Sequence, residues 1–224
     1  MKNILIAASI LSANFAYLGK EIEDVLKAGA DLIHFDVMDN YYVPNLTIGP
    51  LVLKSLRNYG IKCIIDVHLM TKKVDDLIIK FAKAGANIIT LHPENSYHLD
   101  RSISLIRKYG CKAGIVLNPS TPLCCFDYII NKLDIITIMS VNPGFEKQIF
   151  LNFIYDKIIK IKKIIKKKKI LLEIDGGINI DNIKKVAIAG ADILVIGSAI
   201  FKSSFSYEQT LQTMKLKLNN ISKN

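Results

Sequence analysis

A short phrase, Ala-Gly-Ala followed by Asp or Asn, occurs three times in the chain, at residues 28–31, 84–87 and 189–192. Each copy follows a stretch with helical spacing of apolar residues and precedes a run that is almost entirely apolar. The glycine suits the left-handed conformation that often ends a helix. Nearly continuous apolar runs are typical of parallel strands that are buried on both faces. The phrase therefore marks the passage from a helix to a buried strand, and its repetition predicts a series of βα units.

Eight such runs are present, and amphipathic stretches lie between several of them. The predicted strands are residues 4–9, 32–38, 62–70, 88–92, 112–117, 135–141, 170–175 and 193–197. The predicted helices include residues 18–28, 75–84, 99–109 and 181–189. Dividing the 224 residues by eight leaves 28 for each unit, which is enough for a strand, a helix and two loops.

This regularity predicts an α/β fold, a (β/α)8 TIM barrel that occupies residues 1–224 as a single domain. In such barrels the active site lies at the C-terminal ends of the strands. A doubly wound open sheet is the alternative. The Gly-x-Gly-x-x-Gly turn that usually follows the first strand of that fold is absent from the sequence.

Composition narrows the class of protein further. Half of the residues are hydrophobic, which is sufficient for a large core. The four cysteines show no Cys-x-x-Cys spacing, so we expect reduced thiols in a cytoplasmic protein. No apolar run reaches the ~18 residues of a membrane span. The apolar stretch after Met1 loosely resembles a secretory signal, but it is short and contains serines, so residues 4–8 are predicted to form a buried strand.

The formal charge is +10, and eight lysines and five isoleucines lie between Lys157 and Lys169. Four isoleucines in and just before this stretch recur at helical spacing: Ile154, Ile158, Ile161 and Ile165. The pattern predicts an outer helix with an apolar face toward the barrel and lysines toward water. A surface for nucleic acid or membrane lipid is the alternative. No aromatic residue lies among the lysines to stack on bases, so neither nucleic acid nor a membrane is a predicted partner.

Polar residues occur at the ends of three predicted strands, where apolar residues are expected. His34 and Asp36 end the second strand, His68 ends the third, and Asp175 ends the seventh. His34 and Asp36 are two residues apart, so both side chains point to the same face of their strand. A single histidine at such a position is more often a hydrogen-bonded structural residue than a ligand. Burying four polar groups is expensive unless they are paired or coordinated, and we therefore expect them to converge on a site.

Two imidazoles and two carboxylates form a set of nitrogen and oxygen donors for one divalent metal ion. Zinc, iron(II), manganese and cobalt all accept such a set. Glycine-rich turns follow the sixth, seventh and eighth strands, and they contain Gly144 and Phe145, Gly176 and Gly177, and Gly197 and Ser198. Glycine lets backbone N–H groups approach an anion closely, which suggests a phosphate site. Tight turns without a ligand are the alternative interpretation of these glycines.

The sequence resembles the ribulose-phosphate 3-epimerase family from its first strand to its last helix. The matching segments are IAASILSANFAYLG, HFDVMDNYYVPNLTIGP, DVHLM, LHPE, GIVLNPSTP, MSVNPGF, LEIDGGIN and GADILVIGSAIFK. The resemblance implies a metal-dependent isomerase that interconverts D-ribulose 5-phosphate and D-xylulose 5-phosphate in the pentose phosphate pathway. It also implies a cytoplasmic homo-oligomer whose partner is a small phosphorylated ketopentose.

The resemblance assigns roles to individual residues. It implies metal ligands at His34, Asp36, His68 and Asp175, with Asp36 and Asp175 as the acid/base pair. It implies sugar and phosphate contacts at Ser9, Met38, His68, Met70, Met139, Gly144, Phe145, Gly176, Gly177, Gly197 and Ser198. Inverting C3 of a 2-keto sugar requires proton removal on one face and proton return on the other, which two carboxylates flanking a planar cis-enediolate can perform.

Two departures from the family pattern stand out. The family usually has Gly-Phe-Gly-Gly-Gln after the sixth strand, whereas this chain has Glu146 and Lys147 in place of the second and third glycines. We expect this change to restrict the loop, with Glu146 adding negative charge near the phosphate and Lys147 offsetting it. The family commonly has Asp-Gly after Met38, and this chain has Asn40 in place of the glycine. Asparagine tolerates the left-handed conformation better than most residues, so we expect that change to be mild.

Other functions remain open from the sequence. An epimerase acting on D-allulose 6-phosphate would use the same metal site and differ only in pocket length. A decarboxylase or aldolase on a related phosphate-binding barrel is a second rival. Decarboxylases of that group rely on an Asp-x-Lys-x-x-Asp array, and the comparable strand end here carries His68 and no lysine. A non-catalytic nucleic-acid binder acting through the helix from Lys157 to Lys169 is the most distant alternative.

Overall fold

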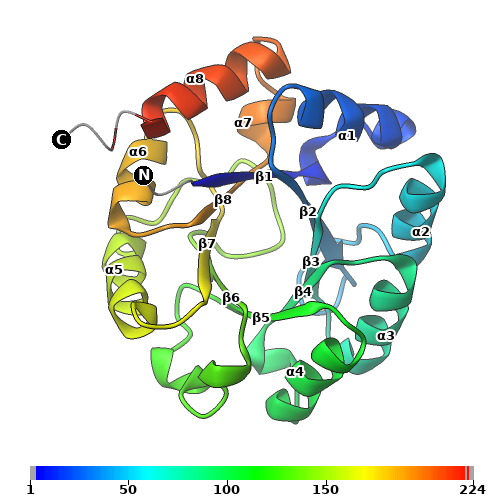
Figure 1. Cartoon of the computed structure of the whole chain (residues 1–224), viewed down its shortest axis with the longest axis vertical. Helices are drawn as coiled ribbons and strands as arrows, with labels where there is room; N and C mark the ends of the chain where they lie inside the picture. The colour runs from blue at the N-terminus through cyan, green and yellow to red at the C-terminus, as the bar shows by residue number, and fades with distance from the viewer. Residues whose placement is uncertain (1–3, 220, 222–224) are drawn as a thin grey trace.

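A computed structural model describes residues 4–219 and 221 of the chain. Within these residues, eight parallel strands form a closed barrel in which the strands follow one another in sequence order (Figure 1). Their bounds are β1 Leu5–Ser9, β2 Leu32–Met38, β3 Ile65–Met70, β4 Ile88–Leu91, β5 Lys112–Leu117, β6 Ile135–Met139, β7 Leu171–Asp175 and β8 Ile193–Ile196. The predicted (β/α)8 barrel is confirmed.

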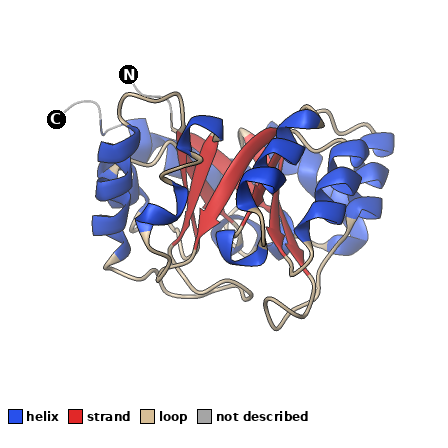
Figure 2. Cartoon of the chain, turned by 90° about the horizontal axis from the view of Figure 1, so that it is seen from below, coloured by secondary structure: helices blue, strands red, loops and turns tan. Residues whose placement is uncertain are grey.

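Helices surround the barrel on the outside, as the side view shows (Figure 2). Their bounds are α1 Leu18–Lys27, α2 Pro50–Tyr59, α3 Val74–Ala84, α4 Leu99–Lys108, α5 Ile154–Ile165, α6 Ile183–Ala189, α7 Ser198–Phe201 and α8 Tyr207–Asn219. The units are less regular than predicted. Short 3-10 turns, η4 Leu123–Phe126 and η5 Ile130–Lys132, connect β5 to β6, and two helices follow β8. Pro119 and Pro122 lie at the start of the β5–β6 connection, where a helix would lose backbone donors.

Most predicted strand bounds are correct to within one residue, and two are not. The third strand begins at Ile65, three residues later than predicted, because the Arg57 side chain donates hydrogen bonds to the carbonyls of Ile61 and Cys63. Those carbonyls are therefore occupied before the strand starts. The sixth strand ends at Met139, two residues early, because Ser140 turns to donate its N–H and its hydroxyl to the carbonyl of Asp175.

The inward-facing side chains fill the barrel in layers. At the N-terminal end the filling is apolar, and consists of Ala7, Leu32, Ile88, Ile135 and Ile193. Further along the strands the inward positions become polar and fully buried: His34, Asp66, Thr90, Thr137 and Glu173. The third layer, at the C-terminal mouth, contains Asp36, His68 and Asp175. The outward positions of the same strands pack against the helices, as Ile33, Phe35 and Val37 of β2 do. The apolar floor thus supports a polar site above it.

The recurring Ala-Gly-Ala phrase acts at the opposite end of the barrel from that site. Its glycines, Gly29, Gly85 and Gly190, all have positive φ, as the helix-ending interpretation requires. The residue that ends the phrase stands directly before an even-numbered strand and accepts a hydrogen bond from a backbone N–H of the preceding odd-numbered strand. These bonds are Ile6 N to Asp31, Ile65 N to Asn87 and Leu172 N to Asp192, at 2.8–2.9 Å.

A fourth residue, Asp134 before β6, accepts from Ala113 N in the same way, although its segment lacks the phrase. We call the four residues Asp31, Asn87, Asp134 and Asp192 the basal ring. Each also contacts a cation from an outer helix: Lys215 at 3.5 Å, Arg57 at 2.7 Å, Arg107 at 2.8 Å and Lys162 at 2.6 Å, in the same order. The ring therefore links every pair of strands to a helix and gives the barrel a fourfold repeat.

Replacing Asp134 by alanine should lower the free energy of unfolding by about 1–3 kcal/mol, because the N–H of the fully buried Ala113 loses its acceptor. Asp134→Asn is the matched control, because Asn87 fills the equivalent position with an amide oxygen. It should retain most of the stability. Urea unfolding measures both changes. Equal stability of the alanine variant and the wild type would contradict this account of the ring.

The lysine-rich stretch forms α5 and the turn after it. Ile154, Ile158, Ile161 and Ile165 are buried, which confirms the predicted apolar face. The prediction that the lysines face water is wrong for two of them. Lys157 Nζ donates to three carbonyls, those of Asn118, Pro119 and Thr121, and Lys162 joins the basal ring. These two ammonium groups are bound within the protein, so they are not available to an acidic partner.

Candidate active site

Four polar side chains meet at the C-terminal mouth of the barrel. His34, Asp36, His68 and Asp175 each offer one atom, and these atoms all lie within 4.8 Å of one another. Strand register brings them together, because Asp36 pairs with His68 across β2 and β3. Asp36 Oδ1 lies 3.4 Å from His34 Nε2 and 3.3 Å from His68 Nδ1. Asp175 Oδ2 lies 3.7 Å from each of the same nitrogens.

His34 is oriented by a carboxylate behind it. Its Nδ1 lies 2.9 Å from Asp66 Oδ2, and both side chains are fully buried. With its proton on Nδ1, the ring donates to Asp66 and turns the lone pair of Nε2 toward Asp36 and Asp175. Nε2 has no hydrogen-bond partner among the described residues. Such an arrangement, with one nitrogen held and the other free, is typical of a metal-binding histidine.

His68 is held by a second histidine. Its Nε2 lies 2.9 Å from Nε2 of His92, and both rings are fully buried. Burial lowers the pKa of His92 well below its usual value, so this ring is neutral. Its Nε2 can therefore accept a hydrogen bond from the N–H at His68 Nε2. The lone pair of His68 Nδ1 then points to the cluster, and this atom too lacks a partner in the described part of the chain.

The two carboxyl groups of the cluster have different electrostatic environments. Without a metal ion, burial disfavours the charged form of His34, but Asp36 and Asp66 outweigh burial and raise the pKa of this ring well above its usual value. Burial also disfavours ionisation of Asp36, but the facing imidazoles of His34 and His68 outweigh it and hold the pKa of Asp36 below its usual value. Ser9 Oγ donates to Asp36 Oδ2 at 2.6 Å. Burial raises the pKa of Asp175 to about 6, and the negative charge of Asp36 adds to the rise. In the metal-free protein Asp175 therefore takes up a proton at a higher pH than an ordinary aspartate does.

The cluster fits a divalent metal ion. Two buried imidazole nitrogens without partners face two carboxylate oxygens, and leaving such atoms buried and unpaired is costly. A cation among them would satisfy both nitrogens and neutralise both carboxylates. His34, Asp36, His68 and Asp175 thus converge at the mouth of the barrel, as the sequence predicted. The choice among zinc, iron(II), manganese and cobalt stays a prediction.

Metal affinity should weaken in acid. Because burial raises the pKa of Asp175 to about 6, this carboxyl is protonated below that pH in the metal-free protein, and a metal ion must displace the proton. Each proton displaced makes the apparent dissociation constant rise about tenfold for each unit of pH below 6. Titration with a competing chelator at pH 5, 6 and 7 measures the slope. A constant affinity over this range would remove Asp175 from the metal site.

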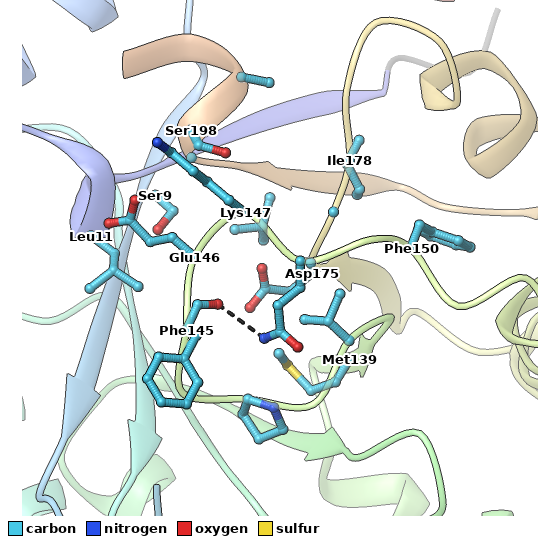
Figure 3. Close-up of a pocket in the computed structure, with 18 of the residues that line it drawn as sticks. Ser9, Leu11, Met139, Phe145, Glu146, Lys147, Phe150, Asp175, Ile178 and Ser198 are labelled. Carbon is cyan, nitrogen blue, oxygen red and sulfur yellow. Dashed lines mark hydrogen bonds between the residues drawn. The ribbon is translucent and has the colours of Figure 1, made fainter. Parts of the chain in front are cut away.

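A cavity of about 660 Å³ opens above the cluster (Figure 3). Its lining includes Ser9, Met38, Met70 and Met139, together with Asp36 and Asp175 of the polar cluster. Every predicted glycine-turn residue lines it too: Gly144, Phe145, Gly176, Gly177, Gly197 and Ser198. Gly177 has a φ of 63°, and a Cβ there would lie 2.7 Å from Phe150 N, so only glycine fits this turn.

Sequence reasoning missed a supporting layer beneath the cluster. Asp66 orients His34, and Glu173 accepts a hydrogen bond from Thr137 at 2.8 Å. Burial, reinforced by the neighbouring Asp66, raises the pKa of Glu173 well above its usual value. The signal for this layer was available, because Asp66 and Glu173 each lie two residues before a predicted ligand, on the same face of the strand. His92 carried a similar signal, because it ends the fourth predicted strand two residues after the inward-facing Thr90, although its contact with His68 depends on the register of β3 and β4.

No helix in the described part of the chain is long and apolar enough to cross a membrane. The four cysteines carry free thiols, as predicted.

The chain is similar to known proteins in both sequence and fold. Residues 5–201 match the sequence profile of the Ribulose-phosphate 3 epimerase family. The Ribulose-phosphate 3-epimerase of Serratia marcescens is 58% identical over 203 residues, which span 90% of this chain and 97% of that protein. The protein of the same name from Escherichia coli K12 is 55% identical over 224 residues, 99% of each chain. KGPDC from Streptococcus mutans shares the fold, with a TM-score of 0.69 at 13% identity over 98% of this chain and 99% of that one.

The site and the comparisons agree. Barrels carry their active sites at the mouth where the buried cluster lies, and identity above 50% extends along almost the whole chain. This chain belongs to the ribulose-phosphate 3-epimerase family, and it is an isomerase of the epimerase class.

Proposed function

We propose that this enzyme interconverts D-ribulose 5-phosphate and D-xylulose 5-phosphate with a divalent metal ion. The observation that supports the proposal is the pairing of two carboxyl groups, Asp36 and Asp175, beside two partner-free imidazole nitrogens in one cavity. The reaction inverts C3, which needs one acid/base group on each face of the sugar. The names of the Serratia and Escherichia relatives point to the same reaction.

In this mechanism Asp36 and Asp175 exchange roles with the direction of the reaction. One carboxylate removes the C3 proton, and the other returns a proton to the opposite face of the planar cis-enediolate. Ser9 fixes the Asp36 carboxylate through its hydroxyl, so the carboxylate does not rotate between steps. In the metal-free protein burial raises the pKa of Asp175 to about 6, and a bound metal ion would favour the ionised carboxylate, the form that accepts the C3 proton.

The rest of the site binds and shields the sugar. When bound by His34, Asp36, His68 and Asp175, the metal ion stabilises the negative charge that develops on the sugar oxygens. The thioethers of Met38, Met70 and Met139 form an apolar, polarizable wall that excludes water from C3. The glycine turns at the other side of the cavity offer backbone N–H groups to the phosphate. We further propose that the enzyme works in the cytoplasm, in the pentose phosphate pathway, as a homo-oligomer.

The experiment that tests this function compares two sugars. A coupled assay should give a kcat/KM for D-ribulose 5-phosphate at least ~10-fold above that for D-allulose 6-phosphate, because one additional carbon must be accommodated between the phosphate turns and the cluster. A preference for the hexulose would establish the alternative epimerase. Absence of turnover on both sugars, in protein shown to contain metal, would reject the proposal.

A further inference from the structure

The loop between β6 and α5 crosses the mouth of the cavity, and one of its residues has an unfavourable backbone conformation. Lys147 has a φ of 57°, in the left-handed region that favours glycine. Asn40 has the same φ, but asparagine tolerates this region, whereas lysine gains nothing from it locally. Strain of this kind persists only where the surrounding structure enforces it, and it is concentrated at functional sites. The assembled loop therefore holds Lys147 in this conformation, and the position of its side chain suggests a function.

That side chain lies over the cavity. Figure 3 shows Lys147 extended toward Ser198, while the preceding Glu146 extends toward Ser9 and Leu11. Lys147 and Lys202, which follows α7, are the two cationic residues that line the cavity. Among residues 4–219 neither ammonium group has a carboxylate within ion-pair distance. The turn of Gly197 and Ser198 thus shares its cavity with two ammonium groups, and one of them, that of Lys147, extends toward Ser198.

The carboxyl groups that line the cavity explain why a lysine at position 147 would help an anionic substrate to bind. Asp36, Glu146 and Asp175 all line it, so a substrate carrying a phosphate of charge about −1.5 to −2 meets three carboxyl groups. A metal ion would offset the two carboxylates of the cluster, but the proposed phosphate site at the glycine turns lies away from the cluster. Backbone N–H groups at the glycine turns supply hydrogen bonds and no net charge. A lysine above the turn adds the missing charge at close range.

We propose that Lys147 is a phosphate-binding residue, whose ammonium group pairs with the substrate phosphate between the β6–α5 loop and Ser198, with Lys202 as a second cation. The proposal rests on the proposed function insofar as the substrate is phosphorylated. The affinity of the enzyme for the substrate phosphate then depends on the charge of the Lys147 side chain. A glycine at this position would offer the phosphate only its backbone N–H. The unfavourable φ of Lys147 is then the cost of placing that charge over the turn.

Four variants test the assignment with D-ribulose 5-phosphate. Lys147→Gly and Lys147→Asn keep the left-handed backbone and remove the charge, and KM should rise about tenfold with kcat within about twofold of the wild type. Lys147→Arg keeps the charge, and its KM should stay within about threefold. Lys72→Asn is the matched control, because Lys72 is exposed at the same end of the barrel but does not line the cavity. Its KM should not change.

Two further measurements separate binding from folding and from the reaction. Calorimetric titration with inorganic phosphate should show about tenfold weaker binding to Lys147→Gly, whether or not the enzyme turns over the sugar. The melting temperature of Lys147→Gly should equal or exceed that of the wild type, because glycine relieves the backbone strain. Unchanged KM and unchanged phosphate affinity in Lys147→Gly would overturn the proposal. A wild type that binds phosphate through Lys147 but epimerises neither sugar would instead reject the proposed function and leave this inference standing.

Discussion

Asp175→Asn is expected to lower kcat for D-ribulose 5-phosphate by two to four orders of magnitude, the usual contribution of a general acid or base. The amide has nearly the same shape as the carboxyl but neither accepts nor donates the C3 proton. Asp36→Asn should have a comparable effect. Metal content must be measured for both variants, because each carboxylate also faces the two imidazole nitrogens at 3.3–3.7 Å. Loss of turnover at full metal content assigns the effect to proton transfer.

Isotope exchange gives this prediction a sharper form. In D2O, a variant that keeps one functional carboxylate should exchange the C3 hydrogen of one epimer with solvent and return deuterium to the same face. Asp36→Asn and Asp175→Asn should each label only one of the two sugars, and a different one. Asp127→Asn, a change at an exposed carboxylate that does not line the cavity, should behave as the wild type. Exchange of both epimers by either variant would show that a single base serves both faces.

Removal of the metal is expected to have the second large effect. Exhaustive chelation should reduce turnover at least ~100-fold, because the charge on the sugar oxygens then loses its main stabilisation. The protein should also lose stability. A ligand present at ~100 times its dissociation constant contributes about 2.7 kcal/mol, which corresponds to a fall in melting temperature of roughly 5–10 °C for a chain of this size.

The choice of metal and of ligands can be checked in the same preparation. Adding zinc, iron(II), manganese or cobalt in turn to the chelated protein should restore both the melting temperature and the activity, to different extents. His34→Gln should prevent restoration, since it removes the nitrogen that faces both carboxylates. His98→Gln is the matched control, because His98 is exposed and lies outside the cluster. Full activity in thoroughly chelated enzyme would remove the metal from the mechanism.

The cluster could be anticipated because β-strands have a simple periodicity. Residues two apart share a face, so His34 and Asp36 could be placed together without coordinates. The parallel barrel then brings the ends of β2, β3 and β7 to one mouth. The same rule also places Asp66 and Glu173 on the inward face of their strands, one layer deeper in the barrel. The sequence also indicates three members of the basal ring, because Asp31, Asn87 and Asp192 end the repeated phrase. Asp134 is not preceded by that phrase, so its membership could not be predicted.

Other features depend on contacts that no sequence pattern encodes. The bond between His68 and His92 requires β4 to place its end beside β3, and the register of two strands is not written in either one. The loop carrying Glu146 and Lys147 has no period, so the direction of its side chains follows only from the assembled mouth. Lys157 shows the same limit, because its helical position predicts solvent exposure and the carbonyls that it binds belong to the segment after β5.

The basal ring also bears on the order in which the molecule can be assembled. β1 lies between β2 and β8, and Asp31 receives its cation from Lys215, near the other end of the chain. During translation, β1 therefore lacks its second neighbour until β8 has been synthesised, and Asp31 lacks its cation until α8 has been synthesised. The barrel can close between β1 and β8 only after the C-terminal units are present, and until then one edge of β1 is unpaired, a feature that favours aggregation.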